Sequence, residues 1–215
     1  MEVTPLAIVL ALAGAAWGFA ADRIGARWPE HEDGSVRPMD WRTPVPVVMG
    51  AVAFGALTLR FTTPVEWLAF GAYLAALVLL LAVDLDQRLL PDELTLPAIP
   101  IVLLFVVVGL DPLVPNTLGW ILMTVAAAVA LPLLLYGFSI PFGEGAFGMG
   151  DVKLLVSVGL LVGPLRLFTG VVYGVLLAGV VIVVLLALRR VTLRSYIPFG
   201  PFLVIGAFWA ILAVA

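Results

Sequence analysis

Long apolar runs dominate this chain and restrict the folds that it can adopt. The stretches Val102 to Val108 and Val180 to Leu188 contain no polar residue at all. Hydrophobic residues make up 63% of the 215 positions, and charged residues only 12%. A water-soluble domain of this size could not bury that much apolar surface, whereas a protein in a bilayer exposes it to lipid. The sequence therefore predicts a protein that crosses a membrane several times.

A bilayer-spanning helix needs about 20 apolar residues, and eight segments of this chain approach or reach that length. Their approximate bounds are 5–21, 44–59, 65–83, 94–110, 118–138, 152–162, 167–188 and 199–215. The alternation of apolar and polar residues that is typical of outer-membrane barrels is missing, and backbone groups in lipid are otherwise satisfied only within helices. We therefore predict an all-α polytopic membrane protein with about eight transmembrane helices.

The amino-terminal part contains the longest polar stretch, about Asp22 to Thr43. We divide the chain into residues 1–43, a first helix with a short polar loop, and residues 44–215, a membrane domain. Met1 to Thr4 carry no basic side chain, so the first apolar run is expected to stay as a span and not to act as a secretory signal. Two Gly-x-x-x-Gly spacings, at 14–18 and 170–174, suit close helix contacts, but such spacings also arise by chance among 21 glycines.

Basic residues are unevenly distributed if alternate loops share one side of the membrane. Arg60 and Arg166 fall on one side, and the other nine lysines and arginines fall on the opposite side. Because cytoplasmic loops carry the excess of basic residues, the richer side should face the cytoplasm. The predicted location is thus a cell membrane, with many passes. The net charge of -3 and the scattered basic residues give no indication of nucleic-acid binding.

Ionisable residues gather at two junctions between apolar runs, and both junctions lie on the predicted cytoplasmic side. The first holds four acids, and the second holds an aspartate and a lysine behind small residues. These six residues are Asp84, Asp86, Asp92, Glu93, Asp151 and Lys153. Ionisable residues at membrane depth are costly and are candidates for function. Simpler explanations also exist: a solvated turn at the first junction, and at the second a helix N-cap with a lysine that reaches the headgroups.

Several kinds of chemistry are excluded by the residue types that the chain lacks. It has no cysteine, and His31, in a polar loop, is the only histidine. Disulfides, thiolate zinc sites, a thiol nucleophile and a plausible Ser-His pair are therefore ruled out. If the reaction is peptide hydrolysis, paired carboxylates remain. One ionised carboxylate would activate a water, and a protonated partner would donate to the scissile carbonyl.

Two other roles for the acids remain open at this point. Paired aspartates hold magnesium in phosphate-handling membrane enzymes, but only Arg88 and Lys153 lie near these acids to bind phosphate. A proton- or cation-coupled transporter would also need acids. Transporter sites usually lie near the bilayer midplane at inverted repeats, whereas these acids lie near span ends and no repeat is visible.

Two separated motifs resemble the type IV prepilin peptidases, membrane aspartic proteases of the GxGD type. Val83-Asp84, followed by Leu90-Pro91-Asp92 and Leu94-Thr95-Leu96-Pro97, resembles the first aspartate motif of the family. Gly148-Met149-Gly150-Asp151-Val152-Lys153-Leu154-Leu155 resembles the second motif. Ile197-Pro198-Phe199-Gly200-Pro201-Phe202 resembles the entry to the last helix of the family. The similarity extends from about Pro44 to the end of the chain.

The resemblance implies that Asp84 and Asp151 form the catalytic pair. It also implies that the substrate is a type IV prepilin or pseudopilin, whose short basic leader is cut at the cytoplasmic face after a glycine. Acidic residues around the pair would attract that leader, and the glycine-rich loop would let its backbone approach closely. The expected substrate-contacting residues are Asp86, Asp92, Glu93, Glu144, Gly148, Gly150 and Lys153. Membrane lipids are the other expected partner, and the sequence does not indicate an oligomeric state.

The chain departs from the family in its first part. Many bacterial members carry a cytoplasmic insert with two cysteine pairs that hold zinc, and they also methylate the new amino terminus from S-adenosylmethionine. Here the cysteines are absent and the loop is short, so the chain is expected to be a short form without bound metal or cofactor. A presenilin-like or signal-peptide-peptidase-like protease is a related alternative. Val83 precedes Asp84 where those enzymes carry tyrosine, and the carboxyl-terminal region has no Pro-Ala-Leu motif.

Overall fold

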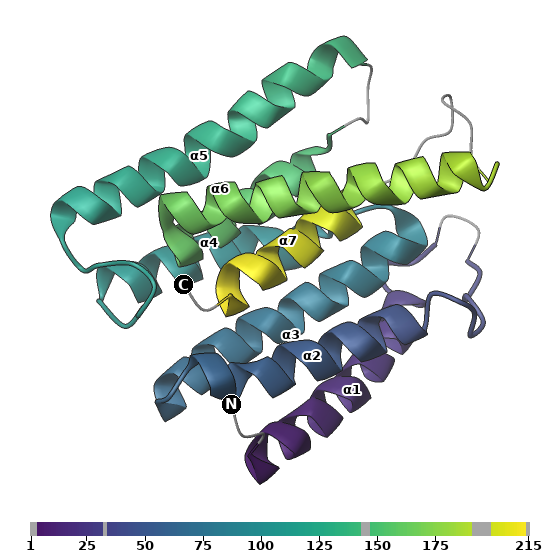
Figure 1. Ribbon diagram of the computed structural model, residues 1–215, viewed down its shortest axis with the longest axis horizontal. Coiled ribbons are helices and arrows are strands. Elements are labelled where there is room, and N and C mark those ends of the chain that lie inside the picture. Colours follow the sequence, from purple (N-terminus) through teal and green to yellow (C-terminus); the bar gives the residue numbers. More distant parts are fainter. Residues whose placement is uncertain (1–3, 32–33, 143–146, 191–198, 214–215) are drawn as a thin grey trace.

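The structure, a computed structural model, describes residues 4–31, 34–142, 147–190 and 199–213. Within these ranges the chain forms seven α-helices and one short 3-10 turn, with no strand (Figure 1). The helices are α1 (Pro5–Gly25), α2 (Pro44–Arg60), α3 (Pro64–Gln87), α4 (Asp92–Val107), α5 (Leu118–Ser139), α6 (Met149–Ala187) and α7 (Gly200–Leu212), and η1 (Ile140–Phe142) follows α5. The all-helical fold class predicted from the sequence is confirmed.

The predicted sixth and seventh spans lie together in α6, so the structure differs from a count of eight separate helices. Gly163 interrupts α6 with a φ of 76°, a conformation that glycine adopts readily and other residues avoid. Pro164 follows it, and proline suits the first turn of a new helix because it has no N–H to donate. The part after the break packs antiparallel to α7, with Gly170 near Gly206 and Gly174 near Phe202. It thus runs back toward the end of the bundle where α6 begins.

Four helices are long and apolar enough to cross a membrane, judged by length and composition. They are α1, α3, α5 and α6, and two further apolar helices, α2 and α7, are shorter. Many of their large apolar side chains are exposed on the outside of the bundle, among them Leu12, Leu68 and Leu122. Such a surface suits lipid contact, because a soluble protein rarely exposes apolar patches of this extent. The chain therefore has several candidate membrane spans.

Close glycine contacts join the helices at two places. A Cβ at Gly14 of α1 would overlap the carbonyl oxygen of Gly50 in α2, and one at Gly170 of α6 would lie 2.8 Å from the carbonyl oxygen of Gly206 in α7. Helices in lipid associate through packing, so small residues that let two backbones approach are stabilising. The two Gly-x-x-x-Gly spacings in the sequence, which chance could also explain, thus lie at real helix interfaces.

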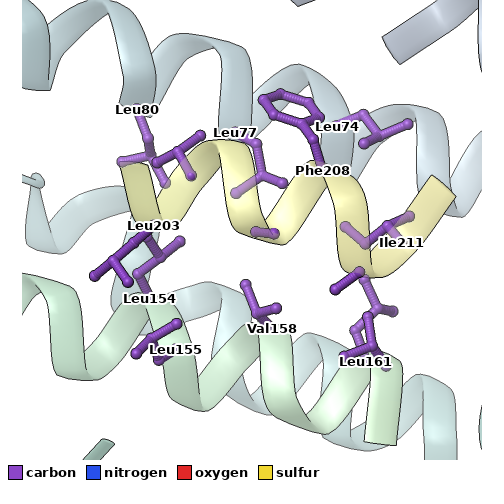
Figure 2. Packing of buried hydrophobic residues seen from close by; sticks show 14 of the residues in the cluster. Leu74, Leu77, Leu80, Leu154, Leu155, Val158, Leu161, Leu203, Phe208 and Ile211 are labelled. Atoms are coloured by element: carbon purple, nitrogen blue, oxygen red, sulfur yellow. The ribbon is translucent and has the colours of Figure 1, made fainter. Parts of the chain in front are cut away.

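Helix α7 lies between α3 and α6 and connects the two helices that carry the acidic motifs. In Figure 2, Leu203, Phe208 and Ile211 of α7 lie between leucines of α3 on one side and Leu154 and Val158 of α6 on the other. These side chains belong to one cluster of buried hydrophobic residues. Close packing of this kind fixes the relative positions of α3 and α6 and of the acids at their ends.

Asp111 is a buried acid in the segment between α4 and α5. Its carboxyl group is 6% exposed, and Oδ1 accepts a hydrogen bond of 2.8 Å from the Leu113 N–H. Oδ2 is buried without a hydrogen-bond partner in the described part of the chain. Burial raises the pKa of Asp111 to about 7, although the Leu113 N–H acts in the opposite direction.

The raised pKa of Asp111 predicts a pH-dependent stability. The folded chain holds this proton up to about pH 7, whereas an unfolded aspartate releases it near the ordinary value of 3.8. The contribution of Asp111 to stability is therefore present at low pH and is lost as the pH rises from about 4 to about 7. We expect thermal unfolding in detergent to show a steeper loss of stability with pH for the natural chain than for Asp111→Asn, by at least about 1 kcal/mol.

The control for this prediction is Glu93→Gln, which changes an exposed acid and should keep the slope of the natural chain. Equal pH dependence in the natural chain and in Asp111→Asn would contradict the prediction.

Candidate active site

Asp84 lies in the last turn of α3, the helix that ends at Gln87. Its backbone carbonyl accepts from the Arg88 N–H at 3.0 Å, and Arg88 then takes a left-handed conformation with a φ of 57°. This ending turns the chain toward Pro91 and the start of α4. The Asp84 side chain is 4% exposed, and its Oδ2 is buried without a hydrogen-bond partner in the residues described. A buried, unpartnered carboxyl oxygen is costly, so it is a candidate for a functional group.

Asp151 lies in the first turn of α6. The simpler explanation from the sequence, that Asp151 is the N-cap itself, is wrong, because the helix begins two residues earlier, at Met149, and Gly148 occupies the cap. Asp151 is the third helical residue, and its Oδ2 accepts a 2.9 Å hydrogen bond from the Gly148 N–H. A carboxylate at this position accepts a hydrogen bond from an otherwise unpaired N–H group. Its negative charge is also stabilised by the positive end of the helix dipole. The bond also fixes the orientation of the carboxyl group.

The ends of α3, α4, α6 and α7 meet at one end of the bundle, and this brings the two motifs together. A Cβ at Gly200, the first residue of α7, would overlap Asp84 Oδ2 and lie 2.8 Å from Asp84 Cγ. A Cβ at Gly150 would lie 3.0 Å from the Cβ of Leu90, which precedes α4. The negative charge of Asp151 is among the electrostatic influences on Asp84. Two carboxyl groups that are 67 positions apart in sequence are therefore carried at the same end of the bundle.

Aromatic residues flank this meeting point. The rings of Phe147, just before α6, and Phe199, just before α7, have centroids 6.3 Å apart. Phe147 is 7% exposed, so its side chain is buried just before the start of α6. These rings lower the polarity around the two acids, and hydrogen bonds and charges act more strongly in such surroundings than in water.

Asp86 is held by basic side chains of the polar loop that precedes α2. Arg37 Nε lies 3.0 Å and Arg42 Nη1 2.9 Å from Asp86 Oδ1, and His31 Nε2 lies 3.2 Å from Oδ2. The Asp86 side chain is only 4% exposed. The negative charge of Asp86 is thus balanced by basic side chains of the same chain. The sequence predicts that Asp86 helps to attract a basic leader, and the exposed acids nearby suit this role better.

The loop cations belong to a buried ionic network that connects the loop to α1 and α3. Arg37 is 8% exposed and forms ion pairs with Asp22 of α1, with Asp40 at 2.6 Å and with Asp86. Burial acts to lower the pKa of Arg37, but Asp22, Asp86 and Asp40 outweigh it and hold the pKa above its ordinary value. Thr43 also donates to Asp22, at 2.9 Å. The network holds the loop against the end of the bundle that carries Asp84.

Removing Arg37 is expected to destabilise the chain markedly. Arg37→Met keeps most of the side-chain volume but leaves the carboxylates of Asp22 and Asp86 short of a partner. Breaking a buried ion pair in this way costs about 3 kcal/mol, because an uncompensated charge stays buried. Thermal unfolding in detergent measures the loss.

Arg27→Met is the matched control, since Arg27 is exposed and its guanidinium donates only to the Arg23 carbonyl among the bonds described. The idea of a stabilising network would be wrong if both variants unfolded at the temperature of the natural chain.

The remaining acids and the lysine near the site have different environments. Lys153 Nζ forms an ion pair with Asp92 Oδ1 at 2.6 Å, and this pair joins the start of α6 to the first turn of α4. The simpler explanation that Lys153 only reaches the lipid headgroups is therefore wrong. The Asp92 side chain is 57% exposed, and Glu93 is exposed as well. Glu144 lies outside the described residues. No cluster of three or more histidines, cysteines or acids that could hold a metal ion is found in the ranges that the structure covers.

Comparison with known proteins identifies the family. The profile of the type IV leader peptidase family matches residues 71–188, which is more than half of the chain and includes Asp84 and Asp151. The chain belongs to the type IV leader peptidase family. This confirms the resemblance seen in the two motifs, and the members of this family are aspartic peptidases.

Curated relatives of the family match most of the chain. The prepilin leader peptidase/N-methyltransferase of Aeromonas salmonicida strain A449 is 32% identical over 170 residues, which are 78% of this chain and 57% of that protein. The protein of the same name from Burkholderia pseudomallei strain K96243 is 32% identical over 187 residues, 85% of this chain and 53% of that protein. That from Neisseria gonorrhoeae is 30% identical over 177 residues, 79% and 57% of the two chains. This chain thus spans little more than half the length of these relatives, and no solved structure matches it.

Sequence reasoning on this leader peptidase family member missed two features of the site. Gly200 was seen only as part of a motif at the entry to the last helix, and nothing in that motif indicates that it packs on Asp84. The basic side chains that contact Asp86 come from a loop 44 or more positions away, so no local spacing could reveal them. An excess of arginines in that polar loop, at Arg37 and Arg42, was the one available signal.

Proposed function

We propose that this chain is a membrane aspartic endopeptidase that removes the short basic leader from type IV prepilins or pseudopilins. Asp84 and Asp151 are the proposed catalytic pair. The single observation that carries the proposal is that the helix ends that carry these two acids meet at one end of the bundle, within a region that matches a family of aspartic peptidases. The printed names of the relatives, prepilin leader peptidases, supply the substrate class.

The proposed mechanism uses the two carboxyl groups and one water. Two carboxyls that share a site cannot both be ionised, so the pair holds one proton between them and titrates jointly. The ionised carboxylate removes a proton from the water as it attacks the scissile carbonyl carbon. The protonated carboxyl donates to the carbonyl oxygen, and the amine leaves with a proton as the tetrahedral intermediate collapses. Atoms balance, because one water adds across one peptide bond.

The two acids of the pair have different surroundings. The Gly148 N–H already donates to Asp151, so this carboxyl has a partner that stabilises its charge. Asp84 lies against Gly200, and its buried Oδ2 has no hydrogen-bond partner in the described structure, so it keeps the capacity to bond a substrate or a water that reaches it. We assign the general base to neither residue alone, since a coupled pair exchanges its proton.

The proposal places the pair at the cytoplasmic face. The distribution of lysine and arginine supports this orientation, and the two parts of α6, counted separately, would give eight crossings in all. Glu93 is exposed at the same end and carries negative charge toward the proposed path of a basic leader, whereas the charge of the exposed Asp92 is paired with Lys153. Electrostatic attraction of this kind raises the rate of encounter between oppositely charged partners.

A direct test incubates the purified full chain, in detergent or in vesicles, with a purified prepilin. Mass spectrometry of the product should show loss of the leader at a single bond that follows a glycine. The proposal would be abandoned if the prepilin stayed intact under conditions in which one of the named relatives trims it. Because the relatives carry a second activity in their names, the assay measures cleavage alone, without S-adenosylmethionine.

A further inference from the structure

An apolar groove between α3 and α4 extends from the active-site end of the bundle into its apolar length. Its volume is about 350 Å³, and alanines form most of its wall on α3. The alanines on α3 are Ala69, Ala72 and Ala76, and they face a wall on α4 that includes larger side chains such as Leu94, Ile101 and Phe105. Large residues in place of these alanines would fill the space beside the α4 side chains, so the alanines keep the groove open.

The floor of the groove is fixed by buried contacts with α6. Leu161 of α6 is 3% exposed and lines the groove. The hydroxyl groups of Tyr73 and Ser157 lie 2.8 Å apart, and Ser157 Oγ donates to the Leu154 carbonyl at 2.9 Å. These bonds hold the Tyr73 ring in place at the side of the groove. The groove is therefore a rigid part of the fold.

One end of the groove lies beside the proposed catalytic pair. Glu93 lines this end, and its neighbour Asp92 bonds Lys153, which is two residues beyond Asp151. The other end reaches Ala69 and Phe105, deep in the apolar part of the bundle. Ala69 and Asp84 are 15 residues apart on α3, a distance of about 22 Å at 1.5 Å per residue. A segment in the groove would thus point toward the active site.

We propose that this groove binds the apolar membrane helix of the substrate, on the carboxyl side of the scissile bond. Small residues let a second helix approach closely in lipid, where packing drives helix association. The exposed Glu93 at the groove's end matches a substrate whose basic residues directly precede an apolar segment. The occupant is therefore a helix with a positively charged amino-terminal flank, and a helix with acidic flanks would be repelled. This inference rests on the proposed function, since it places the same substrate.

The absence of cysteine from the chain makes the groove testable by cross-linking without background. Single cysteines are placed by Ala72→Cys in the groove and by Ala51→Cys in a second apolar groove, between α1 and α2, that serves as the control. Each is oxidised in vesicles with a prepilin that carries one cysteine in the first turns of its apolar helix. We expect a disulfide-linked product with the prepilin for Ala72→Cys and no such product for Ala51→Cys.

A kinetic test replaces the same alanine with a larger apolar side chain instead of a cysteine. Ala72→Leu fills the groove, so the KM for a full-length prepilin in vesicles should rise about tenfold, which is about 1.4 kcal/mol of lost binding, while kcat changes little. Ala51→Leu, in the control groove, should leave both constants unchanged. A fall in kcat alone, or equal effects of the two variants, would overturn the inference.

The outcomes separate the groove from the function. If the natural chain cleaves prepilin but Ala72→Cys gives no cross-link, the groove proposal is wrong and the function stands. If Ala72→Cys cross-links the substrate helix but the natural chain leaves the prepilin intact, the function is wrong and the groove stands. Cross-linking of Ala72→Cys to a second copy of this chain, in place of the substrate, would show that the groove is a dimer contact and would also overturn the proposal.

Discussion

Asp84→Asn and Asp151→Asn are each expected to reduce prepilin cleavage by at least about 10³-fold, because general acid–base chemistry by a paired carboxyl needs both groups. Asparagine has nearly the shape of aspartate but cannot exchange a proton at neutral pH. Because the two side chains have similar volumes, the loss of activity should appear as a lower kcat, while the variant still folds. Initial rates with a purified prepilin, measured beside thermal unfolding of each variant, test this expectation.

Asp111→Asn is the matched control for these two variants. Asp111 is also a buried acid, 6% exposed, but it lies between α4 and α5, away from the helix ends that meet around Asp84. The Asp111→Asn variant should cleave the prepilin at close to the rate of the natural chain. Normal cleavage by Asp84→Asn or by Asp151→Asn would remove that residue from the catalytic pair.

Gly200→Ala is expected to lower kcat by about 100-fold, because a misplacement of reacting groups by about 1 Å has effects of this size. A Cβ at this position would overlap Asp84 Oδ2 and lie 2.8 Å from Cγ, so the carboxyl group must move. Gly200 is a positioning residue in this account and does not itself react. The expected signature is a fall in kcat with a KM close to that of the natural chain.

Gly179→Ala is the control for Gly200→Ala. It also changes a glycine of a helix, but a Cβ at Gly179 has no atom within 4 Å apart from its own helix. Natural kinetics for Gly179→Ala, and a lowered kcat for Gly200→Ala at similar thermal stability, would agree with displacement of Asp84. A natural kcat for Gly200→Ala would show that the position of the Asp84 carboxyl does not limit the reaction.

Much of the fold could be predicted from the sequence, because apolar length alone determines where helices cross a bilayer. Each predicted segment lies within or overlaps a helix of the structure. The relation between the sixth and seventh segments could not be predicted, because Gly163-Pro164 can end one helix or join two. Only the backbone of Gly163, with its φ of 76°, shows the sharp break inside one element.

The candidate site was partly predictable for a different reason. Asp84 and Asp151 stand in motifs whose residue order resembles a family, so their sequence neighbours identify them. Contacts between distant segments have no such signal, which is why the packing of Gly200 on Asp84 and the pairing of Arg37 with Asp86 were missed. The Gly-x-x-x-Gly spacing that begins at Gly170 is weak evidence by itself, because the chain is rich in glycine. The close approach of Gly170 to Gly206 in the structure shows that this spacing lies at a helix contact.

The most direct test of the central claim is the position of the two carboxyl side chains around a bound substrate. An electron cryo-microscopy structure of Asp84→Asn with an uncleaved prepilin would show it. The account predicts that residue 84 and Asp151 lie on either side of the scissile peptide bond, both within hydrogen-bond reach of its carbonyl or of one water. A scissile bond held elsewhere, or a packed helix between residue 84 and Asp151, would contradict the account.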